Sequence, residues 1–434
     1  MKKLLGVLCI LFMAGAMVFG GGGGQQRTQS TGTGGELAGT LKYFEPHYSD
    51  PSVKLAVDES VRMFQQIHPK VQFDIQYVPM AERTARFLAA MAANDGPDVA
   101  CVGNFGDYRA FVEADYLLEM GDKFISNPTE YWNRFPKAFV DYMTIDGKRY
   151  GILYYSGPYA IFYNKKAYAE AGITTMPRTW PEFRETMKKL TVDKNGDGRI
   201  DQYGFVMPTV REVAPRIFSM MAWSNGGAVS RDDLTTVTIN SPECVEALDF
   251  LTSMFTDGSI PPGIVTGADD ESGELFGNGV AVSRFEGIWS LMSIPTSYPQ
   301  LTDNIGVYPI PAPVGKQGVP LSILAVYSLT SQTRNIPASF AFIDFITTDP
   351  VQQMYLNVAG YGPITHSAID ANMDNPVFGG FITLMNNARI KPIFKNDGQV
   401  DDIIREAMQR SFLRQSTPKE ALDIAAEKLR PVIR

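Results

Sequence analysis

Residues 39–78 read GTLKYFEPHYSDPSVKLAVDESVRMFQQIHPKVQFDIQYV and contain two strand patterns with one helix pattern between them. Residues 39–45 are rich in β-forming side chains, and residues 71–78 alternate apolar and polar positions as a half-buried strand does. The segment between them carries an apolar stripe at helical spacing, formed by Val57, Val61, Phe64 and Ile67. Asp50 and Pro51 suit the N-cap and the first helical position. The stretch therefore predicts a strand, a helix and a strand in succession.

The same alternation continues along the chain. Residues 81–94 predict a helix, and residues 97–102 predict a third strand. Strands that alternate with helices form a mostly parallel sheet through right-handed crossover connections. Ligands of such sheets bind beyond the carboxyl ends of the strands. The segments 44–47 and 103–107 are therefore candidates for a ligand site.

The rest of the chain predicts a second region of the same kind. Thr179 with Glu182, and Thr417 with Glu420, have the spacing of capping boxes at helix starts. The expected elements are strands over 202–208 and 279–289 and helices over 179–190, 241–258, 335–348, 349–360 and 416–433. Because 434 residues exceed what one hydrophobic core supports, we expect two lobes.

The N-terminal residues have the pattern of an export signal. Residues 1–20 combine two lysines, an apolar run and a small-residue cleavage context, and residues 21–35 are predicted to be a flexible Gly-rich linker. Leu8 is too large for a lipidation motif before Cys9. An exported protein can form disulfides, yet two buried free thiols are the favoured reading of Cys101 and Cys244. We expect a soluble protein of the periplasm.

The composition and motifs argue against most enzyme classes. A net charge of −8 gives no attraction for nucleic acid or an anionic membrane. The three histidines lie in no metal-binding spacing, and neither a GxSxG elbow nor a glycine-rich phosphate loop is found. Paired carboxylates for glycoside hydrolysis stay open, because only geometry identifies them. We expect a protein that is not an enzyme and requires no cofactor.

Aromatic and polar residues are frequent in the connections between these elements, among them Tyr154, Tyr155, Tyr159, Trp223, Trp289 and Tyr361. Flat rings beside Asn, Asp and Glu suit sugars, because a ring stacks on C–H groups while polar groups bond hydroxyls. The alternative is that these rings pack in the core or between the lobes, since large aromatic residues are highly buried on average.

Several segments resemble, in order and spacing, the family 1 extracellular solute-binding proteins of sugar ABC importers. They are LKYFE, MAANDGPDVACVG, DGKRYGILYYSGPYAIFYNK, AWSNGGA, FGNGVAVSRFEGIWS and AFIDFITTDPVQQMYLNVAGYGPITHSA. The resemblance covers residues 36–434. It implies an α/β periplasmic binding protein type II fold with two interleaved lobes and a hinge. The implied lobes are 36–155 with 286–348, and 156–285 with 349–434, and the chain would cross near 153–161, 284–289 and 347–350.

The resemblance also implies a function without chemistry. A sugar or oligosaccharide would bind in the cleft between the lobes, the hinge would close, and a membrane permease would receive the closed monomer. The implied ligand-binding residues are Phe44, Glu45, Asn104, Asp107, Tyr155, Trp223, Asn225, Glu286, Trp289 and Tyr361. Residues 322–328 lack a glycine turn that is frequent in the family, so that wall of the pocket is expected to differ.

Two alternatives remain open at this point. A polyol or glycerol-phosphate ligand would need a basic pocket, and Arg284 is the arginine found near the implied segments. A secreted carbohydrate-active enzyme with a structural calcium is the alternative from a different class.

Residues 193–204, DKNGDGRIDQYG, resemble the start of a calcium loop. The candidate ligands are Asp193, Asn195, Asp197, the carbonyl of Arg199, and Asp201. The twelfth position is Gly204, where calcium loops carry a bidentate Glu, and a strand pattern follows instead of a second helix. The stretch predicts either an Asx- and Gly-rich turn with solvated carboxylates or a static Ca²⁺ site completed by a carboxylate from elsewhere.

Overall fold

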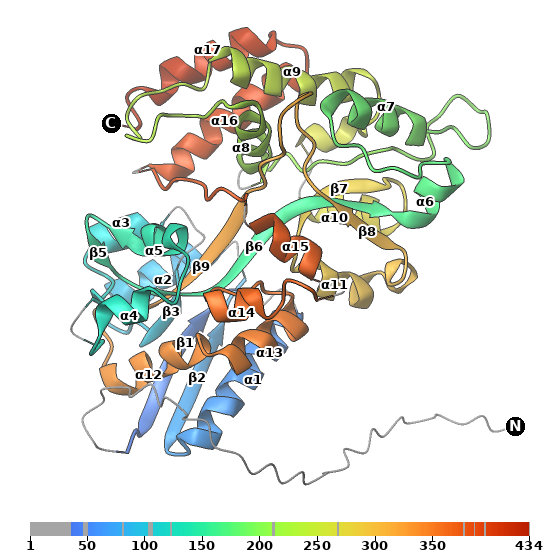
Figure 1. The fold of residues 1–434 in the computed structure, drawn as a ribbon. Coiled ribbons are helices and arrows are strands. Elements are labelled where there is room, and N and C mark those ends of the chain that lie inside the picture. Colours follow the sequence, from blue (N-terminus) through green and yellow to red (C-terminus); the bar gives the residue numbers. More distant parts are fainter. Residues whose placement is uncertain are drawn as a thin grey trace, which may run out of the picture.

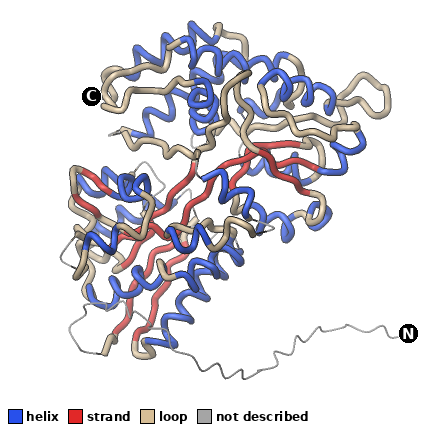
Figure 2. Tube along the Cα trace, viewed as in Figure 1, coloured by secondary structure: helices blue, strands red, loops and turns tan. Residues whose placement is uncertain are grey.

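The computed structural model describes residues 36–46, 51–79, 82–102, 107–121, 124–210, 213–266, 269–375, 378–385, 387–394 and 396–433. Within them the chain forms two lobes that long strands join (Figure 1), and helices cover the strands (Figure 2). A seven-stranded sheet has the order β2-β1-β3-β9-β6-β7, and β8 also pairs with β6. Its strands are β1 (Gly39–Glu45), β2 (Val71–Tyr77), β3 (Val99–Cys101), β6 (Ile152–Asn164), β7 (Ser283–Gly287), β8 (Ile305–Tyr308) and β9 (Ser322–Leu329). The predicted α/β class is confirmed.

The first lobe begins with the predicted strand, helix and strand, and β1 pairs in parallel with both β2 and β3. Alternate side chains of β1 reach opposite faces of the sheet. The Tyr43 ring lies 5.5 Å from Phe342 on one face, and the Phe44 ring lies 5.9 Å from Phe87 on the other. The helices of this lobe are α1 (Pro51–Ile67), α2 (Arg83–Ala92), α3 (Tyr108–Glu113), α4 (Pro128–Trp132), α5 (Lys137–Met143), α12 (Ile336–Ile346), α13 (Asp349–Ala359) and α14 (His366–Asp370). A small hairpin joins β4 (Thr144–Ile145) to β5 (Lys148–Arg149).

The second lobe is built around β7, β8 and the end of β6. Both predicted capping boxes are present, at Thr179 for α7 and at Thr417 for α17. Trp180 stacks on Phe250 with ring centroids 4.7 Å apart, which fixes α7 against α9. The elements are α6 (Lys165–Glu170), α7 (Trp180–Leu190), α8 (Ala214–Asn225), α9 (Pro242–Thr256), η2 (Pro262–Thr266), α10 (Asp269–Gly277), α11 (Ser290–Ser297), η3 (Pro299–Leu301), α15 (Gly379–Met385), α16 (Asp397–Phe412) and α17 (Pro418–Leu429).

Strand β6 passes from one lobe to the other. Its residues 152–158 pair with β9, and its residues 159–164 pair with β7 and β8. Every described partner of β6 runs antiparallel to it, so the sheet as a whole is mixed rather than mostly parallel. The parallel prediction applies only to the first three strands. The main connections between the lobes are therefore strands.

The lobe boundaries differ from the predicted ones in two places. Residues 290–308 were expected in the first lobe, but they follow β7 in the second lobe, where β8 pairs with the second-lobe end of β6. Residues 349–370 were expected in the second lobe, but α13 packs on α1 and α12. The hydroxyl of Tyr355 in α13 donates a hydrogen bond to Ser60 of α1 over 3.2 Å.

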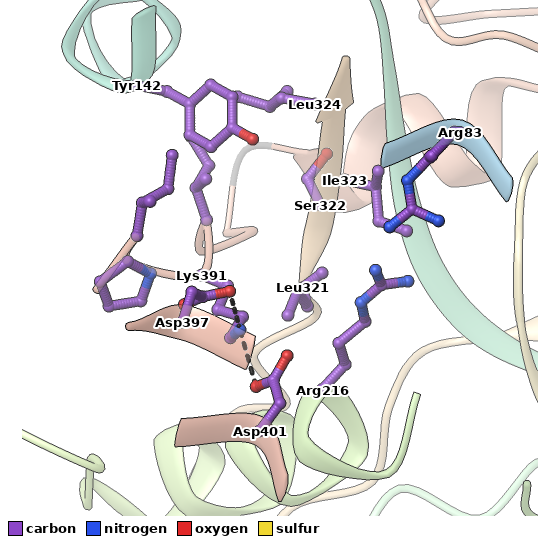
Figure 3. A pocket seen from close by; sticks show the side chains of 13 residues that line it. Arg83, Tyr142, Arg216, Leu321, Ser322, Ile323, Leu324, Lys391, Asp397 and Asp401 are labelled. Carbon is purple, nitrogen blue, oxygen red and sulfur yellow. Dashed lines mark hydrogen bonds and ion pairs between the residues drawn. The ribbon is translucent and has the colours of Figure 1, made fainter. Parts of the chain in front are cut away.

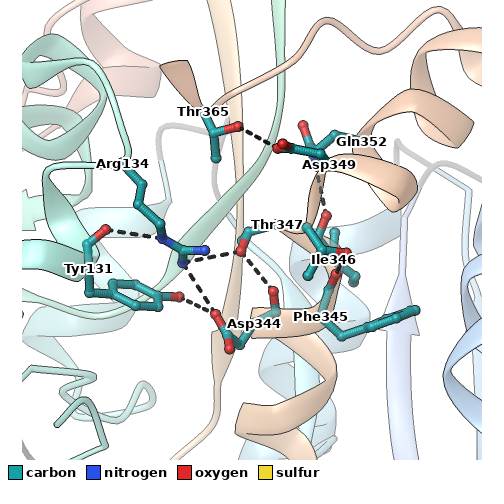
Figure 4. A network of polar contacts seen from close by, with 10 residues as sticks. Tyr131, Arg134, Asp344, Phe345, Ile346, Thr347, Asp349, Gln352 and Thr365 are labelled. Atoms are coloured by element: carbon teal, nitrogen blue, oxygen red, sulfur yellow. Dashed lines mark hydrogen bonds and ion pairs between the residues drawn. The ribbon is translucent and has the colours of Figure 1, made fainter. Parts of the chain in front are cut away.

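A polar network explains why the chain does not cross between the lobes at residues 347–350 (Figure 4). Arg134 lies 3.3 Å from both Asp344 and the Thr347 hydroxyl, which it reaches as a hydrogen-bond donor. Gln352 donates to the carbonyls of Tyr154 and Ile346. These contacts hold the two-residue link between α12 and α13 in the first lobe.

Residues 202–208, a predicted strand, form isolated bridges instead, from Gln202 to Val192, from Tyr203 to Ala281 and from Val206 to Arg284. Gly204 lies against the backbone of Met187, where a Cβ atom would come within 2.1 Å of the carbonyl oxygen. This close approach to α7 interrupts the pairing that the sequence pattern predicts.

Two further findings bear on the predictions for the exported chain. Cys101 and Cys244 are buried free thiols, as predicted, and burial raises the pKa of both. Among the described helices, none combines the length and apolar character needed to cross a membrane. The signal and linker predictions for residues 1–35, and the Asp50 cap, lie outside the described residues.

Candidate functional site

A cavity lies where the two lobes face each other beside the start of β9 (Figure 3). The space inside it is about 70 Å³, and it opens to solvent. The described residues that line it are Arg83, Tyr142, Arg216, Leu321, Ser322, Ile323, Leu324, Ile390, Lys391, Pro392, Ile393, Asp397 and Asp401. Helices α2 and α5 of the first lobe and α8 and α16 of the second contribute side chains. We call this cavity the interlobe cleft.

The segment that carries Lys391 is fixed to the start of β9. The Arg389 amide donates to the Pro320 carbonyl, and the Ser322 amide donates to the Arg389 carbonyl, both over 2.9 Å. Helix α16 begins six residues after Lys391, at Asp397. Asp397 and Asp401 share a face of that helix because they are four residues apart.

Lys391 forms ion pairs with both carboxylates of α16, at 2.7 Å from Asp397 and 2.7 Å from Asp401. Burial raises the pKa of Asp401 to about 6, and the negative charge of Asp397 acts in the same direction, while Lys391 opposes the shift. Asp401 can therefore gain or lose its proton near pH 6. The net charge of the cluster formed by Lys391, Asp397 and Asp401 changes with that proton, and the cluster lines the cleft.

Two arginines lie at another part of the same cleft. Figure 3 shows the guanidinium groups of Arg83 and Arg216 directed toward each other, from α2 of the first lobe and α8 of the second. Nη1 of Arg216 lies 3.5 Å from the Tyr159 hydroxyl, to which it donates a long hydrogen bond. The half-buried ring of Tyr142 supplies a flat surface in the cleft. The cleft thus offers donors, acceptors and one aromatic ring.

The residues predicted from the resemblance do not gather at this cleft. Of those that the structure describes, none lines it, and Asn104 lies outside the described residues. Phe44 and Asp107 line a smaller neighbouring cavity of about 10 Å³, to which Arg83 also contributes. These two predicted residues therefore share a neighbour, Arg83, with the cleft.

Tyr155 and Tyr361 are brought together at the strand that joins the lobes. Their rings stack with centroids 3.9 Å apart, and both side chains are buried. Ser156 pairs with Gly362 through two backbone hydrogen bonds, which fixes the Tyr361 segment to β6. In this structure the two tyrosines pack against each other, as the core-packing alternative expects.

Glu286 and Trp289 line a separate cavity of the second lobe. Glu286 forms a buried ion pair with Arg284 at 2.6 Å. The Trp289 ring lies over Gly157 of β6 and Gly287 of β7, where a Cβ atom would come within 2.7 and 2.1 Å of ring carbons. Glycine at both positions is what allows this ring to lie flat on the strands.

The remaining three predicted residues lie in the interior. Glu45 accepts hydrogen bonds from the hydroxyls of Tyr43 and Tyr327, at 3.0 and 2.8 Å. Asn225 donates to the Glu243 carbonyl and to Glu246, and its own oxygens accept from Lys316. Trp223 is buried, with the Arg389 guanidinium 5.5 Å from its ring centroid. A ligand-binding role for the ten residues stays a prediction.

The loop at residues 193–201 forms a turn in which side chains bond the backbone. Asp193 accepts from the amides of Gly196 and Gly198, and these bonds lower its pKa. Asn195, Asp197 and Asp201 accept from the amides of Asp197, Arg199 and Lys194. Over the part of the chain that the structure describes, no group of three or more His, Cys, Asp or Glu is placed to bind a metal. The structure thus has the Asx- and Gly-rich turn, and calcium binding stays a prediction.

Sequence reasoning missed every charged residue of the interlobe cleft. The spacing of Asp397 and Asp401 was one available signal, because two carboxylates four residues apart mark one face of a helix. Nothing in the sequence pattern, however, places Arg83, Arg216 and Lys391 together, since they come from three distant segments.

The fold and the cleft define a two-lobed protein that is able to enclose a small molecule between its lobes. A family profile described as "Bacterial extracellular solute-binding protein" matches residues 46–353, and the chain belongs to this family. The resemblance stated from the sequence is confirmed.

Three similar proteins differ in the ligands that their names give. The maltotriose-binding protein of Pyrococcus abyssi is 24% identical over 83% of this chain and 77% of its own length. The sn-glycerol-3-phosphate-binding periplasmic protein of Rhizobium meliloti is 24% identical over 74% of this chain and 75% of its own length. The GacH receptor of Streptomyces glaucescens, solved unliganded and with acarbose, covers 92% of this chain and 99% of its own, at 20% identity and a TM-score of 0.80. The structural likeness confirms the type II binding-protein fold.

Proposed function

We propose that this protein is the substrate-binding subunit of a bacterial ABC importer and captures a sugar or oligosaccharide in the interlobe cleft. The observation that carries the proposal is the cleft itself, which combines charged hydrogen-bonding groups and the ring of Tyr142 between two lobes. Polar groups for hydroxyls beside a flat apolar surface are the requirements of a sugar site. The maltotriose-binding relative supports this ligand class.

Capture would act through the hinge. The cleft takes side chains from both lobes, and β6 and β9 run between the lobes at its edge. A ligand that bridges the two walls stabilises the closed form over the open form by its extra contacts. We infer that a membrane permease accepts the closed monomer, and that the N-terminal signal directs export to the periplasm.

We further propose that capture involves no chemical conversion. Glycosidases place two carboxyl groups on either side of the scissile bond. Asp397 and Asp401 instead lie on one face of one helix and contact the same ammonium group. The family is one of binding proteins, which supports this part of the proposal.

A thermal-shift titration against a panel of neutral and acidic sugars tests the function. We expect one member to raise the melting temperature saturably and to be recovered intact afterwards. Release of reducing ends from an oligosaccharide would instead support the enzyme alternative. A panel without any saturable shift would contradict the sugar-binding proposal.

A further inference from the structure

The charge of the interlobe cleft is opposite in sign to that of the whole protein. The chain carries a net charge of −8. The described residues that line the cleft nevertheless include three cationic side chains, Arg83, Arg216 and Lys391, against two carboxylates, Asp397 and Asp401. A local excess of positive charge inside an acidic protein is a property of this site and not of the average surface.

The negative charges of the cleft lie close to Lys391. Both carboxylates contact its ammonium group at 2.7 Å, and the charge of Asp401 also acts on Arg216. The guanidinium groups of Arg83 and Arg216 are directed toward each other in the same cavity (Figure 3). Two like charges directed at one another repel. An anion placed between them is attracted to both, and these two attractions outweigh the repulsion.

Arginine is well suited to this arrangement. Its planar guanidinium group can donate two parallel hydrogen bonds to a carboxylate or phosphate, and such charge-assisted bonds are about twice as strong as neutral ones. The hydrogen bond that Nη1 of Arg216 donates to Tyr159 is long, at 3.5 Å. The two arginines come from different lobes, so an anion that both contact would also link the lobes.

We propose that the sugar bound in the interlobe cleft carries an acidic group, a carboxylate or a phosphate, that binds between Arg83 and Arg216. The inference rests on the proposed function and names the ligand class of that same site. The neutral part of the ligand would lie toward Tyr142 and the Lys391 cluster, where hydroxyl groups find acceptors. Closure of the hinge brings the second arginine onto the anion.

Calorimetric titration with matched pairs of compounds tests the inference. Trigalacturonate is compared with its methyl ester, glucose 6-phosphate with glucose, and sn-glycerol 3-phosphate with glycerol. The first pair tests a carboxylate on a sugar, and the second tests a phosphate on a sugar. The third pair tests whether an anion that is not a sugar binds. We expect an acidic sugar to bind about tenfold or more tightly than its neutral partner, with an affinity that falls between about 50 and about 500 mM NaCl.

Variants identify the residues that are responsible. Arg216→Gln should weaken binding of the acidic sugar about tenfold and remove the preference over its neutral partner. Arg216→Lys should restore part of the affinity, because it returns the charge without the planar fork. Arg178→Gln removes an exposed arginine of the second lobe that does not line the cleft, and should bind as the wild type does. Melting temperatures confirm that each variant is folded.

The outcomes separate this inference from the proposed function. Neutral sugars that bind as tightly as acidic ones, or more tightly, would overturn the inference and leave the sugar-binding function in place. Binding of sn-glycerol 3-phosphate with no sugar binding would overturn the sugar class and keep the anion site. If no acidic compound binds, the inference is wrong.

Discussion

Glu45 and Asp401 are both buried carboxylic acids, but their surroundings differ. Glu45 is fully buried at the end of β1 and accepts hydrogen bonds from two tyrosine hydroxyls. Asp401 is 8% exposed, lines the interlobe cleft and contacts the ammonium group of Lys391. Tyrosine hydroxyls in a packed core are fixed, whereas a lysine at a cavity wall can exchange its partners for those of a ligand. The contrast separates a structural acid from one available for binding.

Replacing Glu45 with leucine should have the largest effect on stability. The change removes an acceptor that the Tyr43 and Tyr327 hydroxyls share in the core of the first lobe. Tyr43 can still donate to the Tyr327 hydroxyl, but the Tyr327 donor loses its carboxylate partner. We expect a loss of about 3 kcal/mol in the free energy of unfolding, measured by urea denaturation. Ligand affinity of the folded variant should stay near that of the wild type.

Tyr43→Phe is the matched control, because it removes one donor and keeps the carboxylate. Its stability loss should be smaller, about 1 kcal/mol. An affinity loss in Glu45→Leu without a loss of stability would reverse the comparison and support the ligand-binding role predicted from the sequence.

Lys391→Met should have the second largest effect. It leaves Asp397 and Asp401 close together without the ammonium group that contacts both. We expect a loss of about 2 kcal/mol at pH 7, together with weaker ligand binding. Adding Asp401→Asn to this variant should recover part of the stability, and a double variant no more stable than the single one would show that the cluster does not govern stability.

A smaller effect is expected in the pH dependence of Asp401. Burial raises the pKa of this group from 3.8 to about 6, so the folded state binds its proton more tightly than the unfolded state does. The stabilisation from protonated Asp401 is complete below about pH 4 and is lost as the pH rises through about 6. The melting temperature of Asp401→Asn minus that of the wild type should therefore increase from pH 4 to pH 7, as scanning calorimetry would record.

Asp249→Asn, which removes an exposed carboxylate of α9, is the control for loss of one negative charge. The account of the cluster would be contradicted if the difference in melting temperature between Asp401→Asn and the wild type stayed constant from pH 4 to pH 7.

The smallest effect is expected at the acidic loop of residues 193–201. Its carboxylates are exposed and already accept backbone hydrogen bonds. We expect about 1 mM Ca²⁺ to change the melting temperature by less than about 1 °C. A rise of several degrees that a chelator reverses, and that Asp193→Ala abolishes, would establish the static calcium site.

The fold was largely predictable because its signals are local. The strand, helix and strand of residues 39–78 follow from periodicity, and the capping boxes at Thr179 and Thr417 follow from spacing. Lobe membership was not predictable in the same way, because contacts such as Arg134 with Thr347 decide where α13 packs.

The cleft was predictable to a smaller extent. Glu45 was predicted to bind the ligand because it lies at the end of a strand. Its carboxylate instead accepts a hydrogen bond from the Tyr327 hydroxyl of β9 in the interior. Lys391 and Asp401 belong to the cleft because the Arg389 segment pairs with the start of β9, which is a tertiary contact. Residue type and spacing carry no record of such contacts.

Hydrogen exchange with and without the tightest ligand of the sugar panel tests the central claim, that the ligand binds in the interlobe cleft. The account predicts slower exchange of the backbone amides in residues 321–324 and 389–401, two segments that line the cleft. Slower exchange confined to residues 283–298, which include Glu286 and Trp289, would contradict it and place the ligand in the other cavity.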